Sequence, residues 1–540
     1  MAGPVSRGAL LLPLGGFLLL SLGGCVDRDL PTAPPTEKPA YAFAMTGPLV
    51  TDNGDDGDGV CDATCTLREA VNAAEEWQTI TFAEGFAGPI VLSQGPIHIE
   101  TPMAISWSGA EPLTVDAAQT SPNMWGSVFR IVNGTVLLSG LRITGGNILG
   151  EGGGIHVSYG ELQLSRSVVT GNSADQLGGG IYSYYSTVTI WQSTISNNTA
   201  GYSGGGIDNG MGSTITIERS TISGNTSDND GGGISNEWGT MLLDRVTVSG
   251  NHASQLGGGV ACFGGNNTII NSTISGNTAP GYGGGGGLVA MNAFVQLGHS
   301  TVTDNEADWG GGIAASDHVG TNVQVLNSIV WGNRNATSPD DLAAELETMG
   351  FSSLGYNLVG VLGAGNAFTA TGDQVGVAAA ELGTLAVNEP GATATHALLE
   401  GSPAIDAGIC TDVAGGTVAT DQRGVTRPQG GVCDIGAYEV VPAEPPPPEA
   451  SFGCTARRNA KKGQLAVEVS WVNADPGVTL IRVMAGRTVT KQQAPSPEGT
   501  WTTSIKTAGD LASFEVRGGS SRKDASYEWV PAGTACTLLP

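Results

Sequence analysis

The chain has 540 residues, of which 84 are glycine and 6% are aromatic, and its formal net charge at pH 7 is −27. So much glycine and so few aromatic residues are typical of a repetitive β protein. The negative charge excludes nucleic acid and a bare anionic membrane as expected partners. The charge is uneven: residues 451–540 hold 11 Lys and Arg against 7 Asp and Glu, a net +4, which leaves −31 on the rest.

The N-terminus has the pattern of an export signal: Arg7, an apolar run over Ala9–Leu22, then Leu-Gly-Gly ending at Cys25. This resembles the lipobox of bacterial lipoproteins, which implies that residues 1–25 are a signal peptide and that Cys25 carries the lipid. An ordinary signal peptide with an incidental cysteine is the alternative. Residues 26–43, rich in Pro and Thr, predict a flexible tether. We expect an exported bacterial lipoprotein at the outer membrane or cell surface, touching the membrane through its lipid only.

Residues 44–140 predict an N-terminal cap and the first coils, with a short helix near Leu67–Glu76. They begin with an acidic loop whose aspartates alternate with glycines, a pattern that suits Ca²⁺. The candidate ligands are Asp52, Asp55, Asp56, Asp58 and Asp62. The bidentate Glu at the twelfth position of an EF-hand loop is missing, because Ala63 falls there. A calcium site and a solvated acidic turn both stay open, and no other cofactor is expected.

Residues 141–335 contain a repeat that decides the architecture. Eight asparagines recur at intervals of 25 to 28 residues: Asn147, Asn172, Asn198, Asn225, Asn251, Asn277, Asn305 and Asn333. The third residue before each, from Asn172 on, is β-branched, the fifth is nearly always Ser, and a glycine run recurs in step. Such a period is the signature of a solenoid.

Each coil predicts three short strands: one after the glycines, one of apolar-polar-apolar type, and one reading Ser-Thr-Ile-Ser-x-Asn. Stacked coils pair each strand with its copies, which makes a right-handed parallel β-helix. Asn side chains in a column can donate to one neighbouring coil and accept from the other, and the Ser column can do the same with hydroxyls. We therefore expect an all-β solenoid held together by two polar ladders.

Three stretches resemble known surface β-helix proteins. Cys61–Val71 is similar to the Cys-Ser-Leu-Arg-Glu-Ala (CSLREA) motif, with Thr66 in place of Ser. Ser402–Gly408, Asp421–Gly424 and Cys433–Glu439 together are similar to the choice-of-anchor Q domain. The Ile-Ser-Gly-Asn-Thr repeats are similar to those of polymorphic outer-membrane proteins. The resemblance implies fold and surface location. The aromatic of the family's Phe-x-x-Asn motif is replaced by Val or Ile, and its adhesin role is not carried over.

A polar column lies six residues before each asparagine. Its candidate ligand-binding members are Arg166, Gln192, Arg219, Arg245 and Asn271, with Glu218 and Asp244 beside them. Stacked arginines beside carboxylates suit an acidic glycan or a protein partner. Exposed ion pairs on a solvated face are the simpler interpretation, because such pairs contribute only about 0–1 kcal/mol each.

Residues 336–440 predict terminal coils, with a further helix candidate at Asp340–Glu347. Their Asp421, Arg423, Arg427, Asp434 and Glu439 predict an ion-pair cap over the last exposed strand rather than a catalytic group. We expect disulfides in such an exported chain, pairing Cys61 with Cys65, Cys410 with Cys433 and Cys454 with Cys536, and Cys262 buried and unpaired.

Residues 441–450 are a proline-rich linker, and the alternating runs of residues 451–540 predict a small β-sandwich resembling fibronectin type III. As a function, we expect a monomeric cell-surface scaffold for binding or adhesion to carbohydrate or surface protein. A lyase or hydrolase acting on acidic polysaccharide is the alternative, although no catalytic residue is identified.

Overall fold

The computed structural model divides into two compact units, Met1–Pro442 and Ala443–Pro540. In the first it describes residues 43, 45–117, 126–281, 283–316, 320–344, 350–363 and 368–442, and in the second the backbone of seven strands, with side chains at Thr500 and Trp501 only. Cys25 and Cys536 lie outside the described residues, and only the backbone of Cys454 is described, so the Cys454/Cys536 pair stays a prediction. Within the described parts, no helix is long and apolar enough to cross a bilayer.

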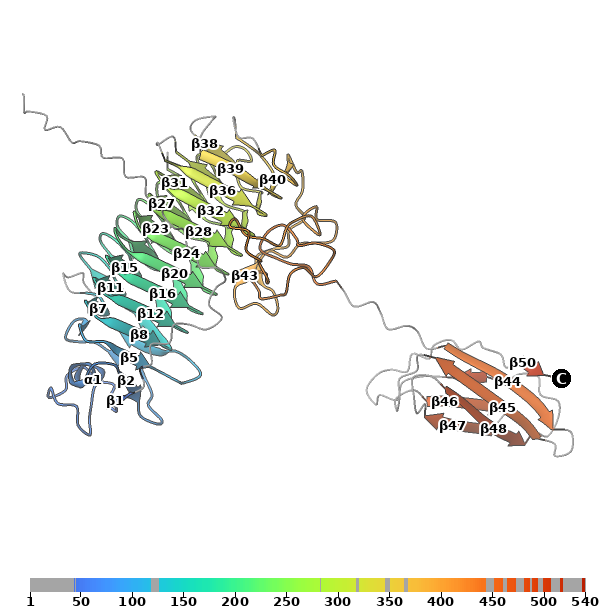
Figure 1. Cartoon of the computed structure of the whole chain (residues 1–540). Helices are drawn as coiled ribbons and strands as arrows, with labels where there is room; N and C mark the ends of the chain where they lie inside the picture. Colours follow the sequence, from blue (N-terminus) through green and yellow to red (C-terminus); the bar gives the residue numbers. More distant parts are fainter. Residues whose placement is uncertain are drawn as a thin grey trace, which may run out of the picture. The chain divides into compact units, whose positions relative to one another are not determined.

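The first unit is a parallel β-solenoid, which confirms the predicted fold class (Figure 1). Each regular coil gives one strand to each of three long sheets, A, B and C, in the chain order C, A, B. A fourth sheet, D, consists of two-residue strands that follow the asparagines, and the sequence did not predict it.

The strands are as follows. Sheet A holds β1 (Met45–Val50), β2 (Gln78–Phe82), β5 (Met103–Ser106), β8 (Thr135–Ser139), β12 (Glu161–Ser165), β16 (Thr187–Trp191), β20 (Thr214–Glu218), β24 (Thr240–Asp244), β28 (Asn266–Ile270), β32 (Phe294–Gly298), β36 (Asn322–Leu326) and β39 (Gly350–Gly355). Sheet B holds β3 (Ile90–Val91), β6 (Leu113–Asp116), β9 (Leu141–Thr144), β13 (Val168–Thr170), β17 (Thr194–Ser196), β21 (Thr221–Ser223), β25 (Thr247–Ser249), β29 (Thr273–Ser275), β33 (Thr301–Thr303), β37 (Ile329–Trp331), β40 (Leu358–Val359) and β41 (Gln374–Val375).

Sheet C holds β4 (Ile97–Ile99), β7 (Phe129–Val132), β11 (Ile155–Ser158), β15 (Ile181–Tyr184), β19 (Ile207–Asn209), β23 (Ile234–Glu237), β27 (Val260–Phe263), β31 (Leu288–Met291), β35 (Ile313–Ala315) and β38 (Leu342–Ala344). Sheet D holds β10 (Asn147–Ile148), β14 (Ser173–Ala174), β18 (Thr199–Ala200), β22 (Thr226–Ser227), β26 (His252–Ala253), β30 (Thr278–Ala279) and β34 (Glu306–Ala307).

The core is a stack of aliphatic side chains pointing inward from sheets A, B and C. Strand residues alternate between the two faces, so every second residue enters the core. On β16, Val188 and Ile190 are fully buried, and the parallel register places them beside Ile215 and Ile217 of β20. Because the register repeats from coil to coil, like side chains stack on like side chains along the whole solenoid.

The predicted asparagine ladder runs from Asn172 to Asn333. Each Nδ2 donates to the Oδ1 of the next ladder residue at 2.8–3.0 Å. Asn333 ends the ladder by donating to Asp341 Oδ1 at 2.8 Å. Asn147 was wrongly included: it pairs with Ser173, one position beyond Asn172, and Gly146 takes the ladder position by donating its N–H to Asn172 Oδ1.

The serine column uses the backbone rather than neighbouring hydroxyls, which corrects the predicted hydroxyl ladder. Ser193 Oγ donates to Trp191 O of its own coil and accepts the backbone N–H of Ser167 from the preceding coil. Asn357 takes the last position, where its Oδ1 accepts the N–H of Ser328. Each such hydroxyl therefore closes the corner of its own coil and joins that coil to the preceding one.

Helix α1 (Leu67–Ala73) packs against β1 and β4 at the N-terminal end of the solenoid. Thr66 caps it in a capping box with Glu69, which explains why Thr can replace Ser in the motif. Leu67 is fully buried, and the Cys61–Cys65 disulfide precedes the helix as predicted. The motif is thus a helix start whose residues each have a structural role.

The predicted helix at Asp340–Glu347 is wrong, because β38 (Leu342–Ala344) lies there and pairs with β35. Residues 368–442 then return along the side of the solenoid, with one antiparallel pair, β42 (Ala386–Val387) and β43 (Ala394–Thr395), and the predicted Cys410–Cys433 disulfide. We name residues 368–442 the return segment (Figure 1).

In the second unit the described strands form two sheets. One contains β48 (Gly499–Lys506), β45 (Gln464–Val472), β44 (Ser451–Asn459) and β50 (Thr537–Leu539), and the other contains β47 (Thr488–Gln493), β46 (Leu480–Ala485) and β49 (Glu515–Arg517). The described part of this unit is therefore all-β, and its arrangement as a sandwich stays a prediction.

Candidate functional site

The predicted polar column is the first residue of the two-residue corner between sheets A and B. All seven residues of the column have a left-handed backbone: Arg166, Gln192, Arg219, Arg245, Asn271, His299 and Asn327, with φ between 46° and 57°. A non-glycine residue in this region is uncommon and costs free energy, so the corner is imposed by the stacked strands on either side. The side chains all leave the solenoid at the same edge.

The return segment divides this column into an open part and a covered part. Arg166, Gln192 and Arg219 are exposed, whereas Arg245 and Asn271 are buried. Arg245 forms an ion pair with Asp244 at 2.8 Å. The prediction that all five residues form one ligand-binding strip is therefore wrong for Arg245 and Asn271, because the return segment lies over this flank.

The covered flank is a polar interface with the outward Thr and Ser side chains of sheet B. Thr273 Oγ1 donates to Gln422 Oε1 at 2.6 Å, and Ser275 Oγ lies 2.9 Å from His396 Nε2. Further along, His299 Nε2 lies 2.9 Å from Thr411 O. Burial lowers the pKa of His299 to about 3, so this imidazole is neutral and its Nε2–H donates to the carbonyl.

The predicted ion-pair cap exists, but it holds the return segment together instead of covering the last strand. Arg423 pairs with Asp421 at 2.7 Å and lies over the ring of Tyr438, and Arg427 pairs with Glu439 at 3.4 Å. Asp434 accepts the backbone N–H groups of Asp406 and Val440. Because these charged side chains are buried and paired, they have a structural role.

The acidic loop does not gather its carboxylates as a calcium site would. Asp55 is buried, and its carboxylate receives Arg68 Nε at 2.8 Å together with the N–H groups of Ser93 and Gln94. The other four predicted ligands are more exposed, and three of them close local turns: Asp52, Asp56, Asp58 and Asp62. The described residues contain no group of three His, Cys, Asp or Glu side chains that could hold a metal ion. Assigning Asp55 to calcium is wrong, because Arg68 neutralises it.

The corner between sheets C and A carries exposed aromatic rings that sequence reasoning missed. Tyr159, Tyr185 and Trp238 are 58%, 47% and 58% exposed. The rings of Tyr159 and Tyr185 are parallel, with centroids 5.7 Å apart, and Tyr184 meets both edge-on. The signal was present, since each aromatic residue stands two positions before a strand of sheet A.

Two glycines let these rings lie flat on the next coil. A Cβ added at Gly212 would meet the ring of Tyr185 at 2.6 Å, and one at Gly264 would meet the ring of Trp238 at 2.5 Å. The rings therefore rest on the backbone of the following coil. All three rings are exposed along one edge of sheet A.

A second buried polar ladder, also missed, supports this corner from inside. Ser183 Oγ donates to Asn209 Oδ1 at 2.9 Å, Asn209 Nδ2 donates to Asn236 Oδ1 at 2.6 Å, and Asn236 Nδ2 donates to Asn267 Oδ1 at 2.7 Å. These residues are almost completely buried next to Cys262, which is unpaired as predicted. The ladder fixes the backbone that carries the rings.

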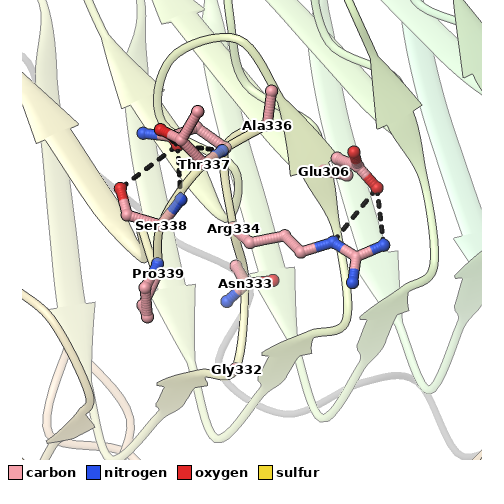
Figure 2. Close-up of a pocket in the computed structure, with 9 residues that line it drawn as sticks. Glu306, Gly332, Asn333, Arg334, Ala336, Thr337, Ser338 and Pro339 are labelled. Atoms are coloured by element: carbon pink, nitrogen blue, oxygen red, sulfur yellow. Dashed lines mark hydrogen bonds and ion pairs between the residues drawn. The ribbon is translucent and has the colours of Figure 1, made fainter.

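A further hollow of about 560 Å³ lies at the far end of the column of asparagines (Figure 2). It is lined by Glu306 and by Gly332–Pro339. Arg334 donates to Glu306 at 2.7 Å, and Asn335 Oδ1 accepts the N–H groups of Thr337 and Ser338. Since Arg334 is occupied by Glu306 and Asn335 by its own turn, the hollow is explained as a loop surface.

Comparison with known proteins supports the fold and gives no function. Residues 180–341 match the family model described as a right handed beta helix region. No curated protein and no solved structure matches the chain. The solenoid is therefore a right-handed parallel β-helix.

Proposed function

We propose that the protein is an exported, lipid-anchored scaffold of the cell surface that binds glycan on the outward face of sheet A. The observation that carries this proposal is the pair of edges that border this face. Tyr159, Tyr185 and Trp238 form one edge, and the exposed column of Arg166, Gln192 and Arg219 forms the other.

These two edges suit a carbohydrate ligand better than a protein ligand. Flat, exposed rings stack on the apolar faces of sugars, while the Thr side chains of β16 and β20 between the edges offer hydroxyl groups for hydrogen bonds. Each strand is five residues long, so the face is about 16 Å wide, and three coil steps make it about 14 Å long. The arginines favour glycans that carry negative charge on this side.

The test is glycan binding by the full chain and by a variant with Tyr159, Tyr185 and Trp238 replaced by alanine. We expect at least tenfold weaker binding of the ligand found on a panel of neutral and acidic polysaccharides. Tyr202→Ala is the matched control, because Tyr202 is 55% exposed elsewhere on the solenoid. Equal binding by the triple variant would refute the proposal for this face.

The same panel tests the alternative function. A polysaccharide lyase creates a new absorbance and a hydrolase creates reducing ends, whereas a binding scaffold leaves the polymer intact. Release of either product would make the chain an enzyme, and the two edges would then be parts of its substrate site.

A further inference from the structure

Two neighbouring coils depart from the repeat at the lobe where the chain passes from sheet D back to sheet C. The departure is seen at three positions of the lobe. In four successive coils, the residue before the first glycine is Leu177, Ser203, Asp230 and Leu256. In the same order, the outward residue of sheet C is Tyr182, Asp208, Ser235 and Ala261. The second residue of each sheet D strand is Ala174, Ala200, Ser227 and Ala253. Serine and aspartate thus replace Leu, Tyr and Ala in adjacent coils.

These replacements bring oxygen atoms into a buried space. Ser203, Asp208, Ser227 and Ser235 are all 0% exposed. In later coils the same space is a small apolar core, in which Leu256, Ala261 and their neighbours pack together. A close-packed lobe has therefore been replaced by a polar one.

The strand and bridge register places these residues next to one another. Ser203 pairs with Asp230 in a parallel bridge, and Asp208 pairs with Ser235 between β19 and β23. The covering chain is in direct contact, since a Cβ added at Gly204 would lie 2.7 Å from Asp208 Cβ. The four side chains thus occupy two layers of one small lobe.

Most side-chain oxygens of this lobe lack a hydrogen-bond partner; the exception is Asp230 Oδ2, which accepts from Asn229 Nδ2 at 2.9 Å. Nine buried side-chain polar atoms are unpartnered in the described residues, and six of them are here: Ser203 Oγ, both carboxylate oxygens of Asp208, Ser227 Oγ, Asp230 Oδ1 and Ser235 Oγ. Buried polar groups normally have partners, because leaving one unpaired costs about 1–3 kcal/mol. Six in one place indicate that something else binds them.

The charge of the surroundings defines that partner. Among the described residues, no Lys or Arg forms a salt bridge with Asp208 or Asp230, so neither carboxyl group has a cationic side chain as a partner. Oxygen donors in a negative site favour a hard cation over an anion or a hydrophobic ligand.

We propose that Ser203, Asp208, Asp230 and Ser235 form a buried binding site for a hard divalent cation, Ca²⁺ in the first place. Two carboxylates and two hydroxyls supply the ligands, and Ser227 stands three residues before Asp230 on the same lobe. Such an ion would join two coils at a point where the apolar packing of the neighbouring lobes is missing. The acidic loop near Asp55 is a different place on the molecule and takes no part.

The experiment uses the full chain. Its metal content is measured as isolated, and its melting temperature is measured with chelator and after Ca²⁺ or Mg²⁺ is restored. We expect one bound equivalent, and a melting temperature that chelator lowers and Ca²⁺ restores. Exchange is allowed at elevated temperature because the site is buried.

The variant takes its residues from the next coil: Asp208→Ala together with Asp230→Leu, as in Ala261 and Leu256. We expect it to lose one equivalent of metal and to melt equally with and without chelator. In chelator it should melt no lower than the wild type, because the unpaired carboxylates are gone. The control variant Asp56→Asn with Asp58→Asn, in the acidic loop, should keep the full response to chelator.

Two results would overturn the proposal. One is a wild-type chain that binds neither Ca²⁺ nor Mg²⁺, which would mean that the carboxyl groups are held protonated. The other is an undiminished response to chelator in the lobe variant, or its loss in the acidic-loop variant, which would place the ion elsewhere.

Discussion

Replacing Asn225 by leucine tests the ladder at its centre. Asn225 Oδ1 accepts two hydrogen bonds from Asn198, one from the backbone N–H at 3.0 Å and one from Nδ2 at 3.0 Å. Leucine accepts neither, so two buried donors lose their partner. At about 1–3 kcal/mol for each unpaired donor, and with some return from the larger apolar side chain, we expect a loss of about 3 kcal/mol in the free energy of unfolding.

The matched control is Asn147→Leu. Asn147 belongs to the sequence repeat, yet it lies one position away from the ladder and is only partly buried. We expect this variant to change the free energy by less than about 0.5 kcal/mol. The measurement is urea unfolding of both variants beside the wild type. Equal losses in the two variants would refute the reasoning, since the ladder bonds would then contribute nothing of their own.

Three other outcomes follow from the same structure. Cys25→Ser should release the protein from the membrane fraction without changing its melting temperature, and unchanged partitioning would count against the lipobox. Arg166→Gln together with Arg219→Gln should weaken glycan binding in a salt-dependent way and leave the free energy of unfolding unchanged. Arg245→Gln should instead lower the free energy of unfolding by about 3 kcal/mol, because it leaves the buried Asp244 carboxylate unpaired. The reverse pattern would show that Arg166 and Arg219 do not belong to the binding face. His299 has a pKa of about 3 in the folded state against an ordinary 6.5, so the folded state binds fewer protons than the unfolded state. The free energy of unfolding should therefore fall by about 1.4 kcal/mol per pH unit below pH 6.5. In His299→Gln, urea unfolding should show a smaller change of this free energy between pH 7 and pH 5.

The repeating part of the fold could be predicted because each coil solves the same physical problem. The β-branched residue before each asparagine has to fill the core, and the buried amide of the asparagine needs hydrogen-bond partners in the neighbouring coils. Both residues therefore recur with the period of the coil. The error at Asn147 has the same origin. An asparagine one residue out of register keeps the spacing of the sequence pattern, and only the strand pairing with Ser173 shows that it points elsewhere.

The covered flank could not be predicted, because it depends on contacts between residues far apart in the chain. Arg219 and Arg245 have the same position in their coils and the same left-handed backbone. They differ because Thr393 and Gln422 of the return segment reach the coil of Arg245, at sequence separations of 148 and more residues. No local pattern contains that information.

Function in a solenoid is best sought where coils that ought to be equivalent differ. Identical coils give identical surfaces, so a ligand site requires side chains that break the repeat. Tyr159, Tyr185 and Trp238 break it at one corner, where Asn133, Gly264 and Asn292 stand in other coils. Asp208 and Asp230 break it in the lobe, where the next coil carries alanine and leucine. The rings remain exposed and can meet a polymer, whereas the carboxylates are buried and can meet only a small ion. The proposed glycan face and the proposed cation site are therefore separable, and removal of the ion should lower the melting temperature without removing the aromatic edge.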